Sequence, residues 1–179
     1  MSNPQNHVFI LMGVSGSGKS AVASAVAHEA DAAMLDGDYL HPRANINKMA
    51  AGHALDDNDR APWLAALNDA IFAMQRTNPV SLLVCSALKK SYRDRLREGN
   101  RNLHFLYLKG DKTVIEERLK QRKGHFFKPQ MLVTQFAALE QPGADENDVM
   151  AIDINQPLDA VIADTVRHIQ SFLPQDVCA

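Results

Sequence analysis

The chain has 179 residues, 46% of them hydrophobic and 22% charged, with a formal net charge of -2 at pH 7. These values are typical of a globular domain with a substantial core, and they disfavour a nucleic-acid-binding surface spread over the whole protein. No apolar run approaches the roughly 20 residues of a membrane helix, and residues 1–7 lack an apolar signal core. The length predicts a single domain over residues 1–179, and the charge and the apolar runs lead us to expect neither nucleic-acid nor membrane partners. Because the two cysteines have neither zinc-site nor disulfide-framework spacing, we expect a reducing cytoplasm.

The first predicted element is a buried strand over residues 8–12, followed by the run Gly13-Val14-Ser15-Gly16-Ser17-Gly18-Lys19-Ser20 and an alanine-rich helix. A strand, a G-x-x-x-x-G-K-[ST] loop and a helix in this order predict a phosphate-binding loop, or P-loop. Its glycines let successive N–H groups face the phosphates, and the helix start adds a positive dipole end. We expect Lys19 to reach the outer phosphates and the Ser20 hydroxyl to hold Mg²⁺. An ordinary Gly/Ser turn is the alternative, but it would not require the Lys-Ser ending.

A second short strand is expected over residues 33–36, and it ends in two acids around a glycine, Asp36 and Asp38. Ligands of open α/β folds bind at the carboxyl ends of the strands, where these acids would lie. We expect Asp38 to accept or orient the proton of a substrate hydroxyl and Asp36 to support Mg²⁺. From the spacing alone, a turn that caps the next helix explains both carboxylates equally well.

The remaining elements alternate between helices and strands. An acidic turn over residues 55–60 is expected to precede a helix that starts near Pro62. Residues 80–85 form the clearest buried strand. The other expected elements are helices over 44–51 and 90–98, a strand over 103–108, helices after Asp111 and around 132–139, a strand over 149–154 and a closing helix over 158–169. About five strands alternating with helices predict an α/β fold with a parallel sheet covered on both faces.

Several strings outside the P-loop make the sequence distinctive. They are Leu35-Asp36-Gly37-Asp38-Tyr39-Leu40-His41-Pro42, Asp59-Arg60-x-Pro62-Trp63-Leu64, Cys85-Ser86-Ala87-Leu88-Lys89-Lys90-x-Tyr92-Arg93, Arg122-Lys123-Gly124-His125-Phe126-Phe127 and Gln141-Pro142-Gly143-Ala144-Asp145-Glu146. With the P-loop, they resemble the bacterial gluconate kinases of the small P-loop type over nearly the whole chain. The resemblance implies a fold like that of nucleoside monophosphate kinases, ATP and Mg²⁺ as cofactors, transfer of phosphate from ATP to D-gluconate to give 6-phospho-D-gluconate, and a homodimer.

Gluconate carries a carboxylate, so we expect basic residues in an acceptor-binding region over about residues 42–78. Arg60 fits because a guanidinium matches a carboxylate in fork geometry, although it could instead neutralise the neighbouring acids. His41 could bind a sugar hydroxyl, and a helix-entry histidine without a role explains it nearly as well. Lys89 lies in a basic first helical turn, which opposes the helix dipole unless an anion binds there.

A lid is expected over about residues 122–130, because this segment is basic and aromatic and is bracketed by glycine and proline. Arg118 and Arg122 share a helix face beside it. In kinases of this shape, such arginines cover the ATP phosphates, and we expect Arg122 to act in catalysis. A plain solvated pair is the alternative. The turn at residues 155–157 is a candidate wall for adenine, although a simple strand-to-helix turn explains it equally well.

Other functions remain open at this point. A shikimate-like or nucleoside monophosphate kinase would share the P-loop and an acceptor-side acid and arginine. A GTPase-like switch would need an Asn-Lys-x-Asp motif, which the sequence lacks, and the strand ending at Cys85 carries no Mg²⁺-holding acid. A nucleic-acid-dependent ATPase does not agree with the small size and near-neutral charge.

Overall fold

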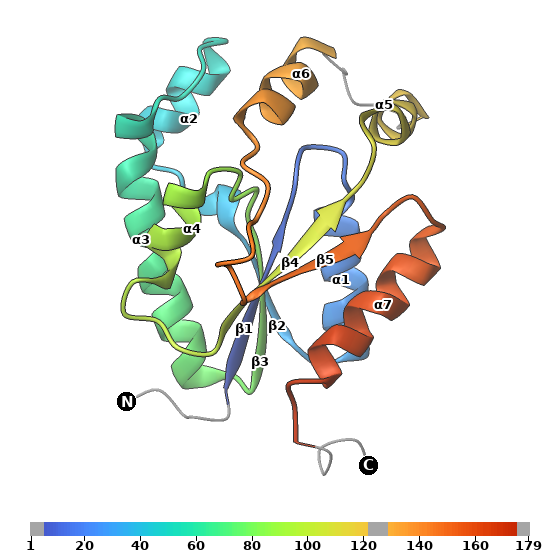
Figure 1. Cartoon of the computed structure of the whole chain (residues 1–179). Coiled ribbons are helices and arrows are strands. Elements are labelled where there is room, and N and C mark those ends of the chain that lie inside the picture. Colours follow the sequence, from blue (N-terminus) through green and yellow to red (C-terminus); the bar gives the residue numbers. More distant parts are fainter. Residues whose placement is uncertain (1–5, 122–128, 175–179) are drawn as a thin grey trace.

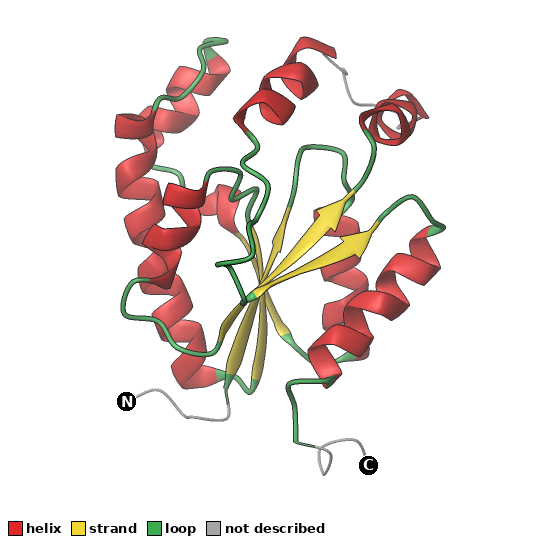
Figure 2. Ribbon diagram, in the orientation of Figure 1, coloured by secondary structure: helices red, strands yellow, loops and turns green. Residues whose placement is uncertain are grey.

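The computed structural model describes residues 6–121 and 129–174, and in these ranges five parallel strands form one sheet in the order β2-β3-β1-β4-β5. Helices cover both faces of the sheet (Figures 1 and 2). The predicted α/β class and parallel sheet are therefore confirmed. The strands are β1 His7–Met12, β2 Ala33–Asp36, β3 Val80–Val84, β4 Leu103–Lys109 and β5 Val149–Asp153; the helices are α1 Lys19–Glu29, the 3₁₀ helix η1 Gly37–Leu40, α2 Arg43–Ala50, α3 Asp57–Thr77, α4 Lys90–Arg97, α5 Lys112–Gln121, α6 Pro129–Ala138 and α7 Leu158–Gln170.

The central strand β1 explains the two-layered core. It pairs with β3 on one side and with β4 on the other, so neither of its edges is open. Phe9 and Leu11 belong to the apolar cluster that contains residues of α1 and α7, whereas Val8 and Ile10 belong to the cluster that contains residues of α3 and α4. A strand buried on both faces needs apolar residues at every position, which is why β1 is a continuous apolar run.

Helix α3 begins at Asp57, so the prediction of a helix start at Pro62 was wrong. The carboxylate of Asp56 accepts the Asp59 N–H, and that of Asp59 accepts the Asp56 N–H, both over 2.8 Å. This reciprocal capping box turns the expected acidic loop into the capped start of a helix. Pro62 falls inside the helix, where it costs one backbone hydrogen bond without ending the helix.

The carboxyl ends of the parallel strands meet at one edge of the sheet. The P-loop, η1 and the segment after β3 leave the sheet at this edge, and α2, α5 and α6 lie beyond it (Figure 1). Of the proposed lid over residues 122–130, residues 122–128 lie outside the described ranges, and residues 129–130 begin α6. Within the described residues, no helix combines the length and the apolar character needed to cross a membrane.

Candidate active site

The P-loop joins β1 to α1 in the conformation that its sequence predicts. Gly16 and Gly18 have positive φ angles of 81° and 97°, in the left-handed region that favours glycine. A Cβ at Gly16 would lie 2.5 Å from Cγ of Leu119 in α5. The loop therefore packs directly against α5, and only glycine satisfies both the backbone angle and this contact.

Lys19, the first residue of α1, folds back over the loop. Its Nζ donates to the carbonyl oxygens of Gly13 and Val14, both over 3.0 Å. Burial lowers the pKa of Lys19 to about 8, and the negative charges of Asp38 and Asp36 oppose this shift. The Ser17 hydroxyl is buried and has no hydrogen-bond partner within the described residues. A half-buried cation and an unpaired buried hydroxyl beside a ring of loop N–H groups fit a bound phosphate chain.

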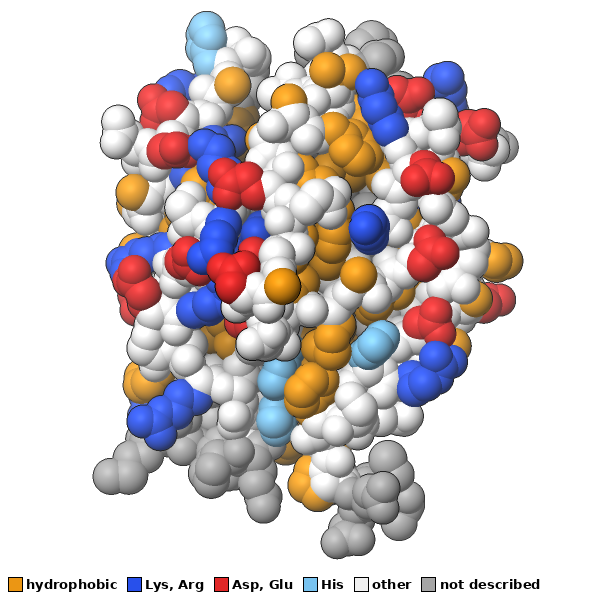
Figure 3. Space-filling model, in the orientation of Figure 1, with side chains coloured by type: hydrophobic (Ala, Val, Ile, Leu, Met, Phe, Trp, Pro, Cys, Tyr) orange, Lys and Arg blue, Asp and Glu red, His pale blue; other side chains and the backbone are white. Residues whose placement is uncertain are grey.

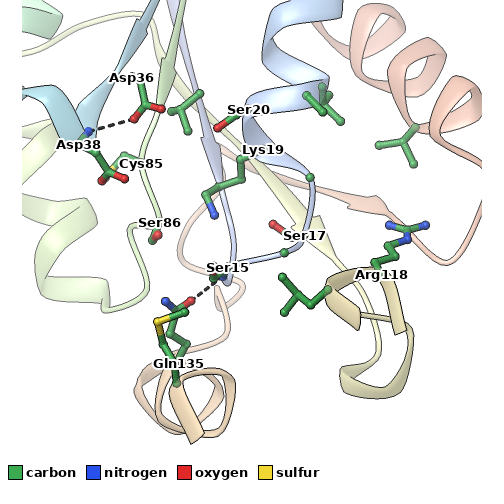
Figure 4. A pocket seen from close by; sticks show the side chains of 18 of the residues that line it. Ser15, Ser17, Lys19, Ser20, Asp36, Asp38, Cys85, Ser86, Arg118 and Gln135 are labelled. Atoms are coloured by element: carbon green, nitrogen blue, oxygen red, sulfur yellow. Dashed lines mark hydrogen bonds between the residues drawn. The ribbon is translucent and has the colours of Figure 1, made fainter. Parts of the chain in front are cut away.

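A cavity of about 750 Å³ opens in front of the P-loop. Figure 4 shows Lys19 and Ser20 on the loop side of this cavity, with Asp36 and Asp38 across from them. Hydroxyl and carboxylate oxygens are ligands that Mg²⁺ prefers, and it usually takes one or two from the protein and the rest from phosphates and water. Ser20 and Asp36 therefore fit the ion, and in the described ranges no group of three or more His, Cys, Asp or Glu side chains forms a metal cage.

The two acids after β2 differ in their contacts. The Asp36 carboxylate accepts the Asp38 N–H over 3.0 Å and so caps η1, as the turn alternative predicts, while it also lines the phosphate-side cavity. The Asp38 side chain lines this cavity and a second one beside it. Asp38 thus lies at the boundary between two binding spaces.

The second cavity, of about 640 Å³, lies between η1, α2, α3, α6 and the segment after β3. All three expected acceptor-side residues, His41, Arg60 and Lys89, line it, although they come from distant parts of the sequence. The residues that line both cavities are Asp38, Met49, Ser86, Met131 and Gln135. No sequence motif selects the last four as site residues, because their position depends on how α2, α6 and β3 pack at the sheet edge.

Arg60 and Lys89 are not equivalent cations. Lys89 pairs with both carboxylate oxygens of Asp57, over 2.9 and 3.0 Å, and this hydrogen bond raises the pKa of Lys89. Arg60 donates from Nη1 to the carbonyl of Leu55 over 2.7 Å and to the Tyr92 hydroxyl over 3.4 Å. Because Asp57 already balances the charge of Lys89, the guanidinium of Arg60 is the better placed of the two to meet an anionic ligand.

The ring of His41 stacks on the indole of Trp63, with centroids 4.3 Å apart and planes within 12°. The indole N–H of Trp63 donates to the carbonyl of Gly37 over 2.8 Å, which fixes the indole against η1. Trp63 and Tyr92 both line the acceptor-side cavity. The sequence placed both in the distinctive strings but did not assign them to the site.

Arg118 lines the phosphate-side cavity, but its Nη2 donates to the carbonyl oxygens of Ile154 and Gln156, over 2.5 and 2.9 Å. It therefore holds the turn after β5, the turn expected as an adenine wall, next to α5. This contact was not foreseen from the sequence. Arg122, expected beside it, lies outside the described residues.

Gln135 of α6 touches the P-loop itself. Its side-chain oxygen accepts the backbone N–H of Ser15 over 2.5 Å, the contact drawn as a dashed line in Figure 4. In a P-loop, such an N–H group is available to a phosphate oxygen. The contact links α6, which follows the proposed lid, directly to the nucleotide loop.

Two further basic residues after β3 have structural partners. Lys90 pairs with Asp94 over 3.0 Å. Arg93 is fully buried, and its five N–H groups donate to the Glu146 carboxylate and to the carbonyls of Ala87, Leu88 and Glu140. The hydrogen bonds that Glu146 accepts from Arg93 and Arg97 lower the pKa of its carboxyl group to about 2. Arg93 thus connects the floor of the acceptor-side cavity to the segment after α6. On the surface over α3 and α4, positive and negative side chains are interspersed (Figure 3).

Comparison with known proteins agrees with this geometry. Residues 8–141 match the model of an AAA domain family. The chain is 69% identical to the thermoresistant gluconokinase of Escherichia coli K12, over 94% of this chain and 97% of that one, and 47% identical to the thermosensitive gluconokinase of the same organism, over 96% and 91%. The crystal structure of a gluconokinase from Sinorhizobium meliloti 1021 matches with a TM-score of 0.77 and 38% identity, over 94% of this chain and 98% of that one. A shikimate kinase from Aquifex aeolicus, at 14% identity and a TM-score of 0.53, shares the fold alone. With a phosphate-binding loop beside an acceptor-side cavity and relatives that match it over almost its full length, this chain belongs to the gluconokinase family.

Proposed function

We propose that this protein transfers the γ-phosphoryl group of ATP to D-gluconate and releases ADP and 6-phospho-D-gluconate. The observation that carries the proposal is the position of Asp38, whose side chain lines both the phosphate-side and the acceptor-side cavity. A phosphoryl group that leaves one cavity for a hydroxyl in the other must cross this boundary. The carboxylate of Asp38 is therefore suited to orient that hydroxyl and accept its proton.

The donor half of the reaction depends on positioning and charge. The P-loop N–H groups and Lys19 bind the phosphates. Ser20 and Asp36 would hold Mg²⁺, which when bound would neutralise negative charge on the transferring group. Lys19 gives up its contacts with the Gly13 and Val14 carbonyls when a phosphate offers it a stronger, charged partner. The expected roles of Arg118 at the nucleotide and of Arg122 in catalysis remain predictions.

The acceptor half is built to bind a polyhydroxy carboxylate. Arg60 binds the carboxylate, and His41 and Lys89 bind hydroxyl or carboxylate oxygens. The support is that all three side chains line one cavity next to Asp38, with the plane of His41 held by Trp63. With a carboxylate at Arg60 and a terminal hydroxyl at Asp38, an extended sugar acid would span this cavity.

A coupled assay of ADP release tests the proposal. Purified protein with Mg²⁺ and ATP is compared with D-gluconate, related polyol acids, shikimate, AMP and no acceptor. Turnover that requires gluconate supports the proposal. Turnover with shikimate or AMP instead would show that gluconate is not the acceptor. ATP hydrolysis at the same rate in every tube would reject the assignment of kinase activity.

The resemblance of the motifs to gluconate kinases also supports a homodimer. Light scattering coupled to size-exclusion chromatography tests it, since a dimer of this 19.7 kDa chain elutes with twice the monomer mass.

A further inference from the structure

His41 is held on two sides. Its ring stacks on Trp63, and its Nδ1 lies 3.2 Å from the side-chain nitrogen of Asn45, one helical turn further along the chain. Asn45 is buried in α2, with only 3% of its surface exposed. Nothing in the local sequence pattern marks Asn45 as a buried residue, because the rest of α2 is mostly exposed.

The contacts of Asn45 determine which nitrogen of His41 carries the proton. The Asn45 Nδ2 also lies 2.8 Å from the backbone carbonyl of Asp59, at the start of α3. A carbonyl oxygen can only accept, so this end of the amide is the NH₂ group and not the oxygen. Its second hydrogen then points to Nδ1 of His41, which must accept it. An imidazole that accepts at Nδ1 carries its proton on Nε2.

We propose that Asn45 is a positioning residue that holds His41 in the Nε2–H tautomer, so that the acceptor-side cavity presents a neutral N–H donor to an oxygen of the substrate. The identity of that substrate rests on the function proposed above, whereas the tautomer does not. Within the described residues, His41 Nε2 has no hydrogen-bond partner, and the ring lines the cavity, so this N–H is available to a ligand.

The charges around the ring are consistent with a neutral donor. Burial is the main cause that lowers the pKa of His41, the Arg60 guanidinium lowers it further, and the Asp38 carboxylate opposes both. The Asp59 carboxylate across α2 is already paired with Lys48, and Lys89 lies in the same cavity, paired with Asp57. A fixed donor selects for a ligand oxygen at this position and against an ammonium or other donor-only group.

Long-range ¹H–¹⁵N correlation spectra of ¹⁵N-histidine-labelled protein test the tautomer directly, with His41→Gln used to assign the signal. The expected wild-type pattern is a neutral ring protonated at Nε2. In Asn45→Asp, a carboxylate replaces the amide and can only accept, so the pattern is expected to change to Nδ1–H and the pKa of His41 to rise. A wild-type ring protonated at Nδ1 would overturn the proposal, whatever the enzyme turns out to phosphorylate.

Kinetics provide the second readout. Asn45→Asp is expected to raise the KM for gluconate about tenfold at pH 8, the loss of one hydrogen bond, with the KM for ATP unchanged. The defect should shrink as the pH falls below the raised pKa, because an imidazolium donates from both nitrogens. A tenfold defect that is the same at every pH would contradict the proposal.

Two variants separate this role from a merely structural one. Asn47→Asp puts the same charge on an exposed position of the same helix and should leave both KM values unchanged. His41→Gln places an amide N–H near the position of Nε2 and should retain most of the affinity, and Asn45→Ala added to it should cost little more. A full additional loss in that double variant would show that Asn45 acts through the fold instead of through His41.

Discussion

The two cavities at the sheet edge are built differently. The phosphate-side cavity is built around one continuous run of the chain, Ser15–Val22, with Lys19 folded back over the loop, and side chains from other segments complete it. The acceptor-side cavity is made by side chains from five separate segments, several of which are already paired with one another. A site made of backbone groups tolerates many side-chain changes, but not a Cβ at a tightly packed glycine such as Gly16. A site made of side chains depends on which of them remain unpaired and can therefore bind a ligand. The same substitution logic therefore cannot be applied to both.

The largest effect is expected at the boundary that the two cavities share. Asp38→Asn should lower kcat about 10³-fold with little change in either KM, because the amide cannot accept the hydroxyl proton. Steady-state kinetics with both substrates varied would measure this. Asp36→Asn is the matched control, since excess Mg²⁺ should restore much of its activity. An equal and Mg²⁺-independent loss in both variants would mean that the two acids act as one structural turn.

The two cations of the acceptor-side cavity, Arg60 and Lys89, should contribute differently to gluconate binding. Arg60→Ala should raise the KM for gluconate about 50-fold, the loss of a charge-assisted contact, and leave the KM for ATP unchanged. Lys89→Ala should have a clearly smaller effect, because Asp57 already neutralises Lys89. Both constants come from the same coupled assay. If the KM for ATP moved instead, Arg60 would belong to the nucleotide side.

A Cβ should break the backbone-built cavity alone. Gly16→Ala is expected to raise the KM for ATP about tenfold and to destabilise the fold, because alanine is strained at a φ of 81° and its Cβ meets Leu119. Gly99→Ala, at a φ of 71° with nothing within 4 Å of its Cβ, carries the strain without the contact. It should cost about 1 kcal/mol of stability and no activity. Adding Leu119→Ala should rescue Gly16→Ala; no rescue would point to strain alone.

The smallest effect concerns pH. In the protein without ATP, Lys19 has a pKa of about 8, so it is charged below pH 8 and loses its charge as the pH rises through that value. The affinity for ATP is therefore expected to fall as the pH rises. If only the charged form binds ATP, the dissociation constant rises about fivefold between pH 8 and pH 9. Titration calorimetry at pH 8 in two buffers should show uptake of about half a proton per ATP. Lys19→Arg should abolish this uptake, since arginine stays charged.

The contrast between the cavities also explains what the sequence could predict. The P-loop is contiguous, so its motif predicted the strand, the loop, the helix and the loop residues that line the phosphate-side cavity at once, whereas Gln135 of α6, which contacts the loop, was missed. The chemistry of His41, Arg60 and Lys89 pointed to each of them separately, but their partners could not be predicted. Trp63 reaches His41, and Asp57 reaches Lys89, only when α3 packs beside η1 and the segment after β3. The acidic run around Asp56 and Asp59 predicts a turn, whereas the structure has a capped helix start there. The signal for the cap is the spacing of the two acids, three residues apart, which is that of a capping box.

The saturated guanidinium of Arg93 limits how this protein can vary. Lysine offers three donors and no fork, so it cannot replace an arginine that uses all five N–H groups. Losing Glu146 alone would leave a buried, unpaired charge, which costs about 3–5 kcal/mol. Positions 93 and 146 therefore constrain each other, and Arg97, which also donates to the Glu146 carboxylate over 2.8 Å, is the third member of this network. A designer who shortens the turn between α6 and β5 must keep both, because apolar replacements would also leave the carbonyls of Ala87 and Glu140 without their Arg93 donor.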